Sequence, residues 1–313
     1  MKSIFTSVLL MAVTLLYGCA SSRTGNSAGD ENKITVSDDK ALQYGTFPVM
    51  ITIPAPSADQ SAEFNANVGG KFTSITKGNG IRLSGYLSNN KYFVDKIMLP
   101  VLQPYMDQLK KQPAGEMINN LILFSHQMFR NYFGYDFYRW GGDLLDLDDP
   151  QYKITRHQYA YGLDCSGFST FAYELAVYTG LMKADDPAAL FSSKGFELYC
   201  KQNNVQDKGG REGTSNNYRL DTSDLISLGK EVFSLKKGEK PADSQISMLR
   251  AGDLINTDGH VGTIVIINSL PYYLESGGYV VPNEGGFPYP AKEALAICAQ
   301  SSPVSVRRAL PGN

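Results

Sequence analysis

A short polar block followed by an apolar helix is the feature that most constrains how this 313-residue chain can fold. The block Asp-Cys-Ser-Gly occupies positions 164–167, and Gly180 closes the stretch that follows it. Asp164 is a typical N-cap residue, and glycine is the usual residue just beyond the end of a helix. The pattern therefore predicts a buried helix that begins at Cys165. Its apolar residues recur at helical spacing: Phe168, Phe171, Ala172, Leu175 and Ala176.

Cys165 would lie in the first turn of this helix, where backbone N–H groups without intrahelical partners and the helix dipole favour an anion. A thiolate is the nucleophilic form of cysteine, and positions of this kind favour it. Gly162 and Gly167 would allow a tight turn into the helix and a close approach of substrate. The alternative is a buried structural cysteine, but the residues described next favour a nucleophile.

A nucleophilic cysteine needs a base, and the chain has three histidines. His260 begins an apolar stretch, predicted as a strand, and a strand would hold the imidazole as rigidly as general-base catalysis requires. His157 lies in a polar run with no regular element. His126 falls on the polar side of a helix predicted at 116–133, where a solvent-facing or hydrogen-bonded role is expected.

The charge balance excludes one broad class of function. Lys and Arg total 29 against 31 Asp and Glu, so the formal net charge is −2 and no basic surface for nucleic acid is expected. Three histidines and four cysteines leave little material for a metal site, and no zinc-protease, Cys-x-x-Cys or phosphate-loop motif is present. We expect neither a metal nor a cofactor.

The first residues are typical of an export signal. Lys2 precedes an apolar stretch at 4–17, which is shorter than the roughly 20 residues that span a bilayer. Gly18 and Cys19 then resemble a bacterial lipoprotein cleavage site, so we expect residues 1–18 to be removed and Cys19 to carry lipid. An ordinary secretory signal with an incidental cysteine is the alternative. Residues 19–45 are expected to form a flexible tether.

Four blocks together resemble the NlpC-type cell-wall cysteine peptidases, which are papain-like α+β enzymes that hydrolyse peptidoglycan stem peptides. In chain order they are Tyr-Arg-Trp-Gly-Gly at 138–142, the block at 164–167, Gly-Asp-Leu at 252–254 and His-Val-Gly at 260–262. The resemblance covers roughly residues 117–310. It implies an α+β fold in which the helix that bears the cysteine packs on an antiparallel sheet.

The resemblance also implies a role for each matching residue. Cys165 would be the nucleophile and its backbone N–H an oxyanion donor, with His260 as the base. Tyr138 would line the active site, although a core aromatic beside Trp140 is the alternative. Asp164 and Ser166 would contribute to substrate binding.

The third polar residue departs from the family, which usually has a histidine on the strand after the base. In the equivalent stretch here, Glu275 is the side chain best able to accept a strong hydrogen bond from an imidazole. A hairpin loop of three or four residues within 268–271 would set Glu275 opposite Thr263 or Ile264, so it would have to reach diagonally to His260. An exposed strand carboxylate is the alternative, with Asn268 and Glu284 as substitutes.

The remaining chain is predicted in outline. Residues 46–112 are expected to hold short strands and a proline-interrupted helix at 91–111, and residues 113–313 the catalytic domain. Insertions are expected near 144–160 and 185–245, the second including a solvated charged loop, and a final strand at 304–310. Cys200 and Cys298 could form a disulfide or remain two separate buried thiols.

These patterns predict an exported, lipid-anchored peptidoglycan hydrolase at the outer membrane or the periplasmic face. Its partners would be stem peptides and, through the lipid, the membrane, and the bond cleaved would join D-glutamate to the diamino acid. Two alternatives remain: a Cys–His acyltransferase or amidase acting on another envelope substrate, and an inactive wall-binding lipoprotein.

Overall fold

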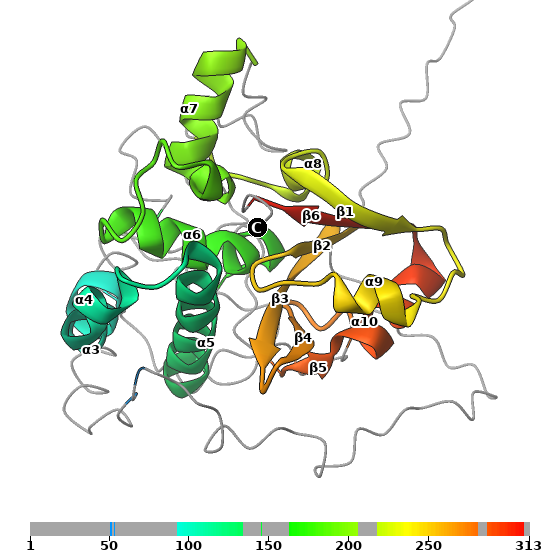
Figure 1. Cartoon of the computed structure of the whole chain (residues 1–313), viewed down its shortest axis with the longest axis horizontal. Helices are drawn as coiled ribbons and strands as arrows, with labels where there is room; N and C mark the ends of the chain where they lie inside the picture. Colours follow the sequence, from blue (N-terminus) through cyan, green and yellow to red (C-terminus); the bar gives the residue numbers. More distant parts are fainter. Residues whose placement is uncertain are drawn as a thin grey trace, which may run out of the picture. The chain divides into compact units, whose positions relative to one another are not determined.

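A six-stranded antiparallel sheet organises the computed structural model, which describes residues 51, 53, 93–133, 145, 163–205, 218–280 and 287–309 (Figure 1). The spatial order within these residues is β1-β6-β2-β3-β4-β5. The strands are β1 (Lys230–Leu235), β2 (Leu254–Thr257), β3 (His260–Ile267), β4 (Leu270–Leu274), β5 (Tyr289–Pro290) and β6 (Val304–Arg308). The chain is thus a mixed helix-and-sheet protein of the α+β class, as predicted.

The two longest described helices lie together on one side of this sheet, and α10 lies on the other (Figure 1). The two longest described helices are α5 (Ala114–Phe133) and α6 (Cys165–Tyr178), and both were predicted from their apolar spacing. The further helices are α3 (Leu99–Leu102), α4 (Met106–Leu109), α7 (Ser193–Asn203), α8 (Thr222–Leu225), α9 (Asp243–Ser247) and α10 (Ala291–Ser301). Short 3₁₀ helices cover Gln103–Tyr105 and Pro187–Phe191.

The predicted interruption of the helix at 91–111 is present. A π-helical turn at Phe93–Met98 leads into α3, and Pro100 and Pro104 lie at the beginning of α3 and of the 3₁₀ turn that follows. Proline lacks a backbone N–H, so each one ends the hydrogen-bonded run before it. These turns pack in the same hydrophobic core as α5 and α6, so a boundary at 112 does not separate two cores among the described residues.

Each face of the sheet buries its own hydrophobic core, because successive residues of a strand point to opposite sides. Leu254, Val261 and Leu274 pack with α5 and α6, whereas their neighbours Ile255 and Tyr273 pack with α10.

The two remaining cysteines follow this division. Cys200, on α7, packs in the first core and Cys298, on α10, packs in the second. The structure thus places them apart as two buried thiols, and the disulfide considered from the sequence is not formed.

The region 185–245, which was expected to be an insertion, contains regular elements that its sequence did not indicate: α7 and the edge strand β1, which pairs with β6. Only Leu235 of β1 is buried, so the strand shows no alternating pattern that could have revealed it. The charged run at 236–240 is exposed as predicted. Of the two roles expected for His126, the solvent-facing one was wrong: the side chain is fully buried on α5, with its ring edge-on to that of Phe168 and the ring centroids 6.2 Å apart.

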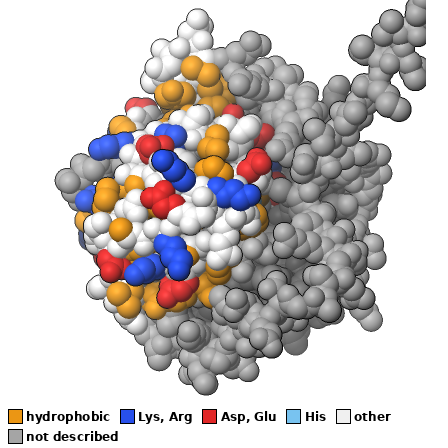
Figure 2. All heavy atoms as spheres, turned by 90° about the vertical axis from the view of Figure 1, so that its right-hand side faces the viewer, with side chains coloured by type: hydrophobic (Ala, Val, Ile, Leu, Met, Phe, Trp, Pro, Cys, Tyr) orange, Lys and Arg blue, Asp and Glu red, His pale blue; other side chains and the backbone are white. Residues whose placement is uncertain are grey.

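Charges on one face of the molecule are mixed in sign (Figure 2). Figure 2 shows the side of the molecule that carries α9 and α10 in Figure 1, with basic and acidic side chains interleaved. One exposed pair, Lys292 Nζ to Asp243 Oδ1 at 2.6 Å, joins α10 to α9. In the part of the chain that the structure describes, no helix has the length and apolarity to cross a membrane.

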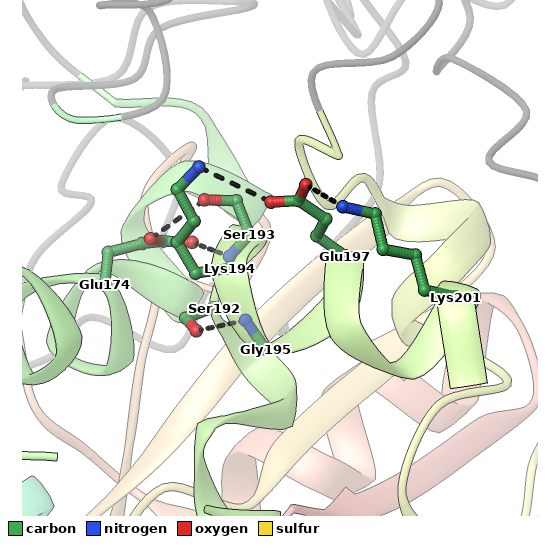
Figure 3. A network of polar contacts seen from close by, with 7 residues as sticks. All are labelled: Glu174, Ser192, Ser193, Lys194, Gly195, Glu197 and Lys201. Carbon is green, nitrogen blue, oxygen red and sulfur yellow. Dashed lines mark hydrogen bonds and ion pairs between the residues drawn. The ribbon is translucent and has the colours of Figure 1, made fainter. Parts of the chain in front are cut away.

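A buried carboxylate attaches α7 to the helix that bears Cys165. Glu174, on α6, accepts hydrogen bonds from the Ser193 backbone N–H and from its hydroxyl at 3.2 Å, which satisfies the first turn of α7 (Figure 3). Ser192 caps the same turn by accepting from the Gly195 N–H at 3.1 Å. Buried helix ends require such partners, so Glu174 holds the two helices together.

We predict that Glu174→Ala lowers the free energy of unfolding by about 2 kcal/mol or more, because it removes a charged acceptor from the buried Ser193 N–H and hydroxyl. Glu197 provides the matched control. It is the same residue type and forms only surface ion pairs with Lys194 and Lys201 (Figure 3), so Glu197→Ala should cost less than about 1 kcal/mol. Urea denaturation of both variants measures the difference, and equal losses would contradict the anchoring role.

Candidate active site

Cys165 is the first residue of α6, and its turn is fixed by the side chain before it. Asp164 Oδ1 accepts hydrogen bonds from the Gly167 N–H at 2.7 Å and from the Ser166 hydroxyl at 2.9 Å. This is the N-cap predicted from the sequence. Gly180, with φ of +70°, follows the end of the helix as predicted. The Cys165 side chain therefore lies at the positive end of a well-anchored helix dipole.

The second carboxylate oxygen of Asp164 contacts a residue that no sequence motif singles out. Arg219 Nη2 lies 2.7 Å from Asp164 Oδ2, and both side chains are largely buried. Arg219 belongs to the segment 218–220, which lies within the region 185–245 that was expected to be an insertion. Asp164 and Ser166 are thus engaged in holding the Cys165 turn, and their contribution to substrate binding stays a prediction.

His260 is the first residue of β3 and pairs across the sheet with Thr257 of β2. Its Nε2 lies 2.7 Å from Glu275 Oε2, and both residues are buried, with exposed fractions of 5% and 4%. Its ring stacks on Tyr279, with the ring centroids 4.8 Å apart and the planes 9° from parallel. The imidazole is therefore fixed in position and in orientation.

The register of the hairpin explains how Glu275 reaches His260. Asn268 and Ser269 both have positive φ, and Ile267 pairs directly with Leu270, so the turn has only two residues. Thr263 pairs with Leu274, and the next step sets Glu275 opposite Gly262, two residues from His260 on the same face.

The predicted hairpin was therefore wrong in detail. The loop is shorter than three residues, and Glu275 is not opposite Thr263 or Ile264. Asn-Ser is not the usual sequence of such a turn, which explains the error. The Glu275 side chain does reach diagonally across the hairpin to His260, as predicted.

The Glu275 carboxylate is hydrogen-bonded at both oxygens. Oε2 accepts from His260 and from the Tyr273 hydroxyl at 2.9 Å, and Oε1 accepts from the Val280 N–H at 2.7 Å. The next residue, Ser276, donates its hydroxyl to the Leu163 carbonyl at 2.7 Å. This bond joins the end of β4 to the residue that precedes Asp164, so the carboxylate and the cysteine helix are held together.

The surroundings of His260 favour its charged form. Burial alone would lower its pKa, but hydrogen bonding and charge attraction to Cys165, and then to Glu275, outweigh burial and raise the pKa to about 10. Because Nε2 faces Glu275, Nδ1 is the nitrogen left to face the thiol. A positive imidazole between two acidic groups can stabilise a thiolate and can donate a proton.

The block at 252–254 serves the sheet beneath the site. The Asp253 carboxylate forms a two-point ion pair with Arg308, with Nε to Oδ1 at 2.6 Å and Nη2 to Oδ2 at 2.7 Å. Gly252, with φ of +80°, lies under the Tyr173 hydroxyl, where a Cβ would come within 2.2 Å. These contacts fix the entrance to β2, which pairs with the strand that carries His260.

The structure thus brings Cys165, His260 and Glu275 together. Asn268, the first substitute for Glu275, follows the last residue of β3, whereas His260 is the first residue of that strand. The other predicted site residues lie outside the described residues: Tyr138 with its neighbour Trp140, Cys19, His157 and Glu284.

Sequence reasoning missed three residues at the site: Tyr273 donates to Glu275, Tyr279 stacks on His260, and Arg219 pairs with Asp164. For Tyr273 a signal existed, because residues two apart on a strand share a face and Tyr273 precedes Glu275 by two.

Within the described ranges, no group of three or more His, Cys, Asp or Glu side chains could hold a metal ion. In comparisons with known proteins, no family model, no curated protein and no solved structure matches the chain.

The raised pKa of His260 predicts how stability changes with pH. Its ordinary value is 6.5 and its folded value about 10, so folding favours the protonated form. The stabilisation should be complete below pH about 6.5 and should decline as the pH rises toward 10. Urea denaturation of the native chain and of His260→Gln at pH 6, 7.5 and 9 should show a difference in unfolding free energy that shrinks with pH.

The control for this experiment is the same substitution in a Cys165→Ala background. Attraction to Cys165 is the main influence that raises the pKa of His260, so the pH dependence should become shallower there. A difference that grew from pH 6 to pH 9 in the native background would contradict the assigned charge.

Proposed function

We propose that this chain is a cysteine peptidase of the NlpC type that hydrolyses an amide bond in peptidoglycan stem peptides. The observation that carries the proposal is the buried pairing of His260 with Glu275, beside a cysteine at the first turn of a helix. A nucleophile, a base and a residue that orients the base are the minimum set for covalent acyl transfer. The matching blocks in the sequence supply the substrate class.

The arrangement supports a defined course of reaction. The Cys165 thiolate attacks the carbonyl carbon, and the carbonyl electrons move to oxygen, where the Cys165 backbone N–H is positioned to stabilise the oxyanion. His260, protonated at Nδ1, gives that proton to the leaving amine as the C–N bond breaks. Neutral His260 then takes a proton from water, which attacks the thioester, releases the acid and restores the thiolate–imidazolium pair.

The finer fold is part of the same proposal. The cysteine helix packs against the sheet strand that carries the histidine, and Ser169 of α6 donates to the Val261 carbonyl of β3 at 3.3 Å. This is the arrangement expected of a papain-like core, which supports assignment to that fold.

The substrate and the location also follow the resemblance. We assign the cleaved bond to the D-glutamyl–diamino acid linkage, with Tyr138 lining the site, and place the enzyme at the outer membrane or the periplasmic face through lipid on Cys19. No cofactor is required, because the thiol, the imidazole and water supply every atom transferred.

The decisive test is release of soluble peptides from purified sacculi. Cys165→Ala should reduce this release by about a thousandfold or more, because removing the nucleophile disables the whole catalytic group. Cys200→Ala is the matched control: this thiol is also buried, but it lies on α7 in the first core, so cleavage should continue. Cleavage that persisted in Cys165→Ala would refute the proposal.

Mass spectrometry of the products separates the remaining possibilities. Fragments ending in a free carboxylate that has gained one oxygen from ¹⁸O-labelled water indicate hydrolysis and support the proposal. Fragments joined to an added amine indicate an acyltransferase. A native chain that binds sacculi and releases nothing indicates a wall-binding lipoprotein. Either of the last two results contradicts hydrolysis.

A further inference from the structure

The ring of Tyr273 occupies a slot that exists only because residue 262 is glycine. A Cβ at Gly262 would lie 2.3 Å from Tyr273 Cε2 and 2.5 Å from its hydroxyl oxygen, distances that real atoms do not adopt. The conformation of Gly262 is ordinary, so the requirement is for space and not for an unusual backbone. The ring therefore lies flat across β3 at the residue between His260 and Ile264 on the same face, and its hydroxyl points toward the catalytic group.

That hydroxyl shares an acceptor with the base. Glu275 Oε2 accepts from His260 Nε2 at 2.7 Å and from Tyr273 at 2.9 Å, while the Val280 N–H holds Oε1. Three donors arranged around one carboxylate fix its rotation. Without the hydroxyl, only the Val280 N–H and His260 would orient the carboxylate. Glu275 could then orient His260 less firmly, because its own position would depend partly on His260.

Tyr273 is suited to act as a permanent donor. It is 1% exposed, and burial followed by the negative charge of Glu275 raises its pKa well above the ordinary value, so the phenol keeps its proton. Cys298 of α10 packs in the same core as Tyr273, and burial raises the pKa of its thiol as well.

From this geometry we propose that Tyr273 is a positioning residue, which holds the Glu275 carboxylate against His260 and depends on Gly262 for its place. Tyr273 acts through Glu275 and does not touch substrate, because it points into the core that is shared with α10. The inference rests on the proposed function only in taking Cys165 as the nucleophile and His260 as the base.

Tyr273→Phe should lower kcat for stem-peptide release about tenfold and leave KM unchanged, because the lost hydrogen bond orients the base and not the substrate. Tyr272→Phe is the matched control: it is the same substitution on the preceding residue, on the opposite face of β4, and should leave kcat unchanged. Gly262→Ala, which keeps the hydroxyl but displaces the ring, should reproduce the loss caused by Tyr273→Phe.

A second measurement needs no substrate. The rate at which iodoacetamide alkylates Cys165 at pH 6, followed on the peptide that contains it, reports the thiolate held by His260. Tyr273→Phe should slow this rate in the native background and should have no further effect in a Glu275→Ala background, because the two residues act in series. An equal slowing in both backgrounds, or a loss of kcat matched by Tyr272→Phe, would overturn the proposal.

The two measurements separate the proposals. Coupling between Tyr273 and Glu275 in alkylation, without release of peptides from sacculi by the native chain, would support the positioning role and refute the substrate class. Release that depends on Cys165, without the coupling, would refute the positioning role alone.

Discussion

A positive charge on a buried imidazole is the constraint on which the rest of the site depends. An isolated charge in such a position would be lost, because burial favours the neutral form. His260 keeps its proton because Cys165 and Glu275 lie on either side of it. A buried carboxylate carries the same cost, and here three hydrogen bonds offset it. Each of these groups thus offsets the desolvation cost of its neighbour. Removing any one of them leaves an uncompensated polar group inside the protein.

Chain segments that are far apart in sequence must meet within hydrogen-bonding distance to bring these side chains together. Contacts made by neighbouring residues fix each segment in position. Asp164 anchors the helix start, and Ser276 joins the end of β4 to Leu163. The ion pair between Asp253 and Arg308 anchors the start of β2 to β6. The precision of the site therefore comes from buried polar bonds at the ends of elements, while the two hydrophobic cores supply the platform.

The sequence was sufficient wherever a local pattern determines structure. Apolar spacing with a cap residue gave α6 and the position of Cys165, and the apolar strand gave the position of His260. It was insufficient where the outcome depends on packing between segments. The strand β1 was missed because only Leu235 is buried, and the hairpin register was missed because Asn-Ser is an uncommon two-residue turn. Arg219 lies outside any motif, and only the folded chain brings it to Asp164.

The presence of a carboxylate as the partner of His260 has a structural consequence that links several of these observations. A neutral imidazole in the place of Glu275 would need one acceptor and one donor, whereas a carboxylate needs donors at both oxygens. The chain provides the additional donors through Tyr273 and the Val280 N–H, and it provides room for the first of these through Gly262. A glutamate introduced without these groups would be a buried, poorly satisfied charge. The carboxylate, the tyrosine and the glycine are therefore best understood as one unit, in which the charge that stabilises the imidazolium requires the hydroxyl and the hydroxyl requires the space.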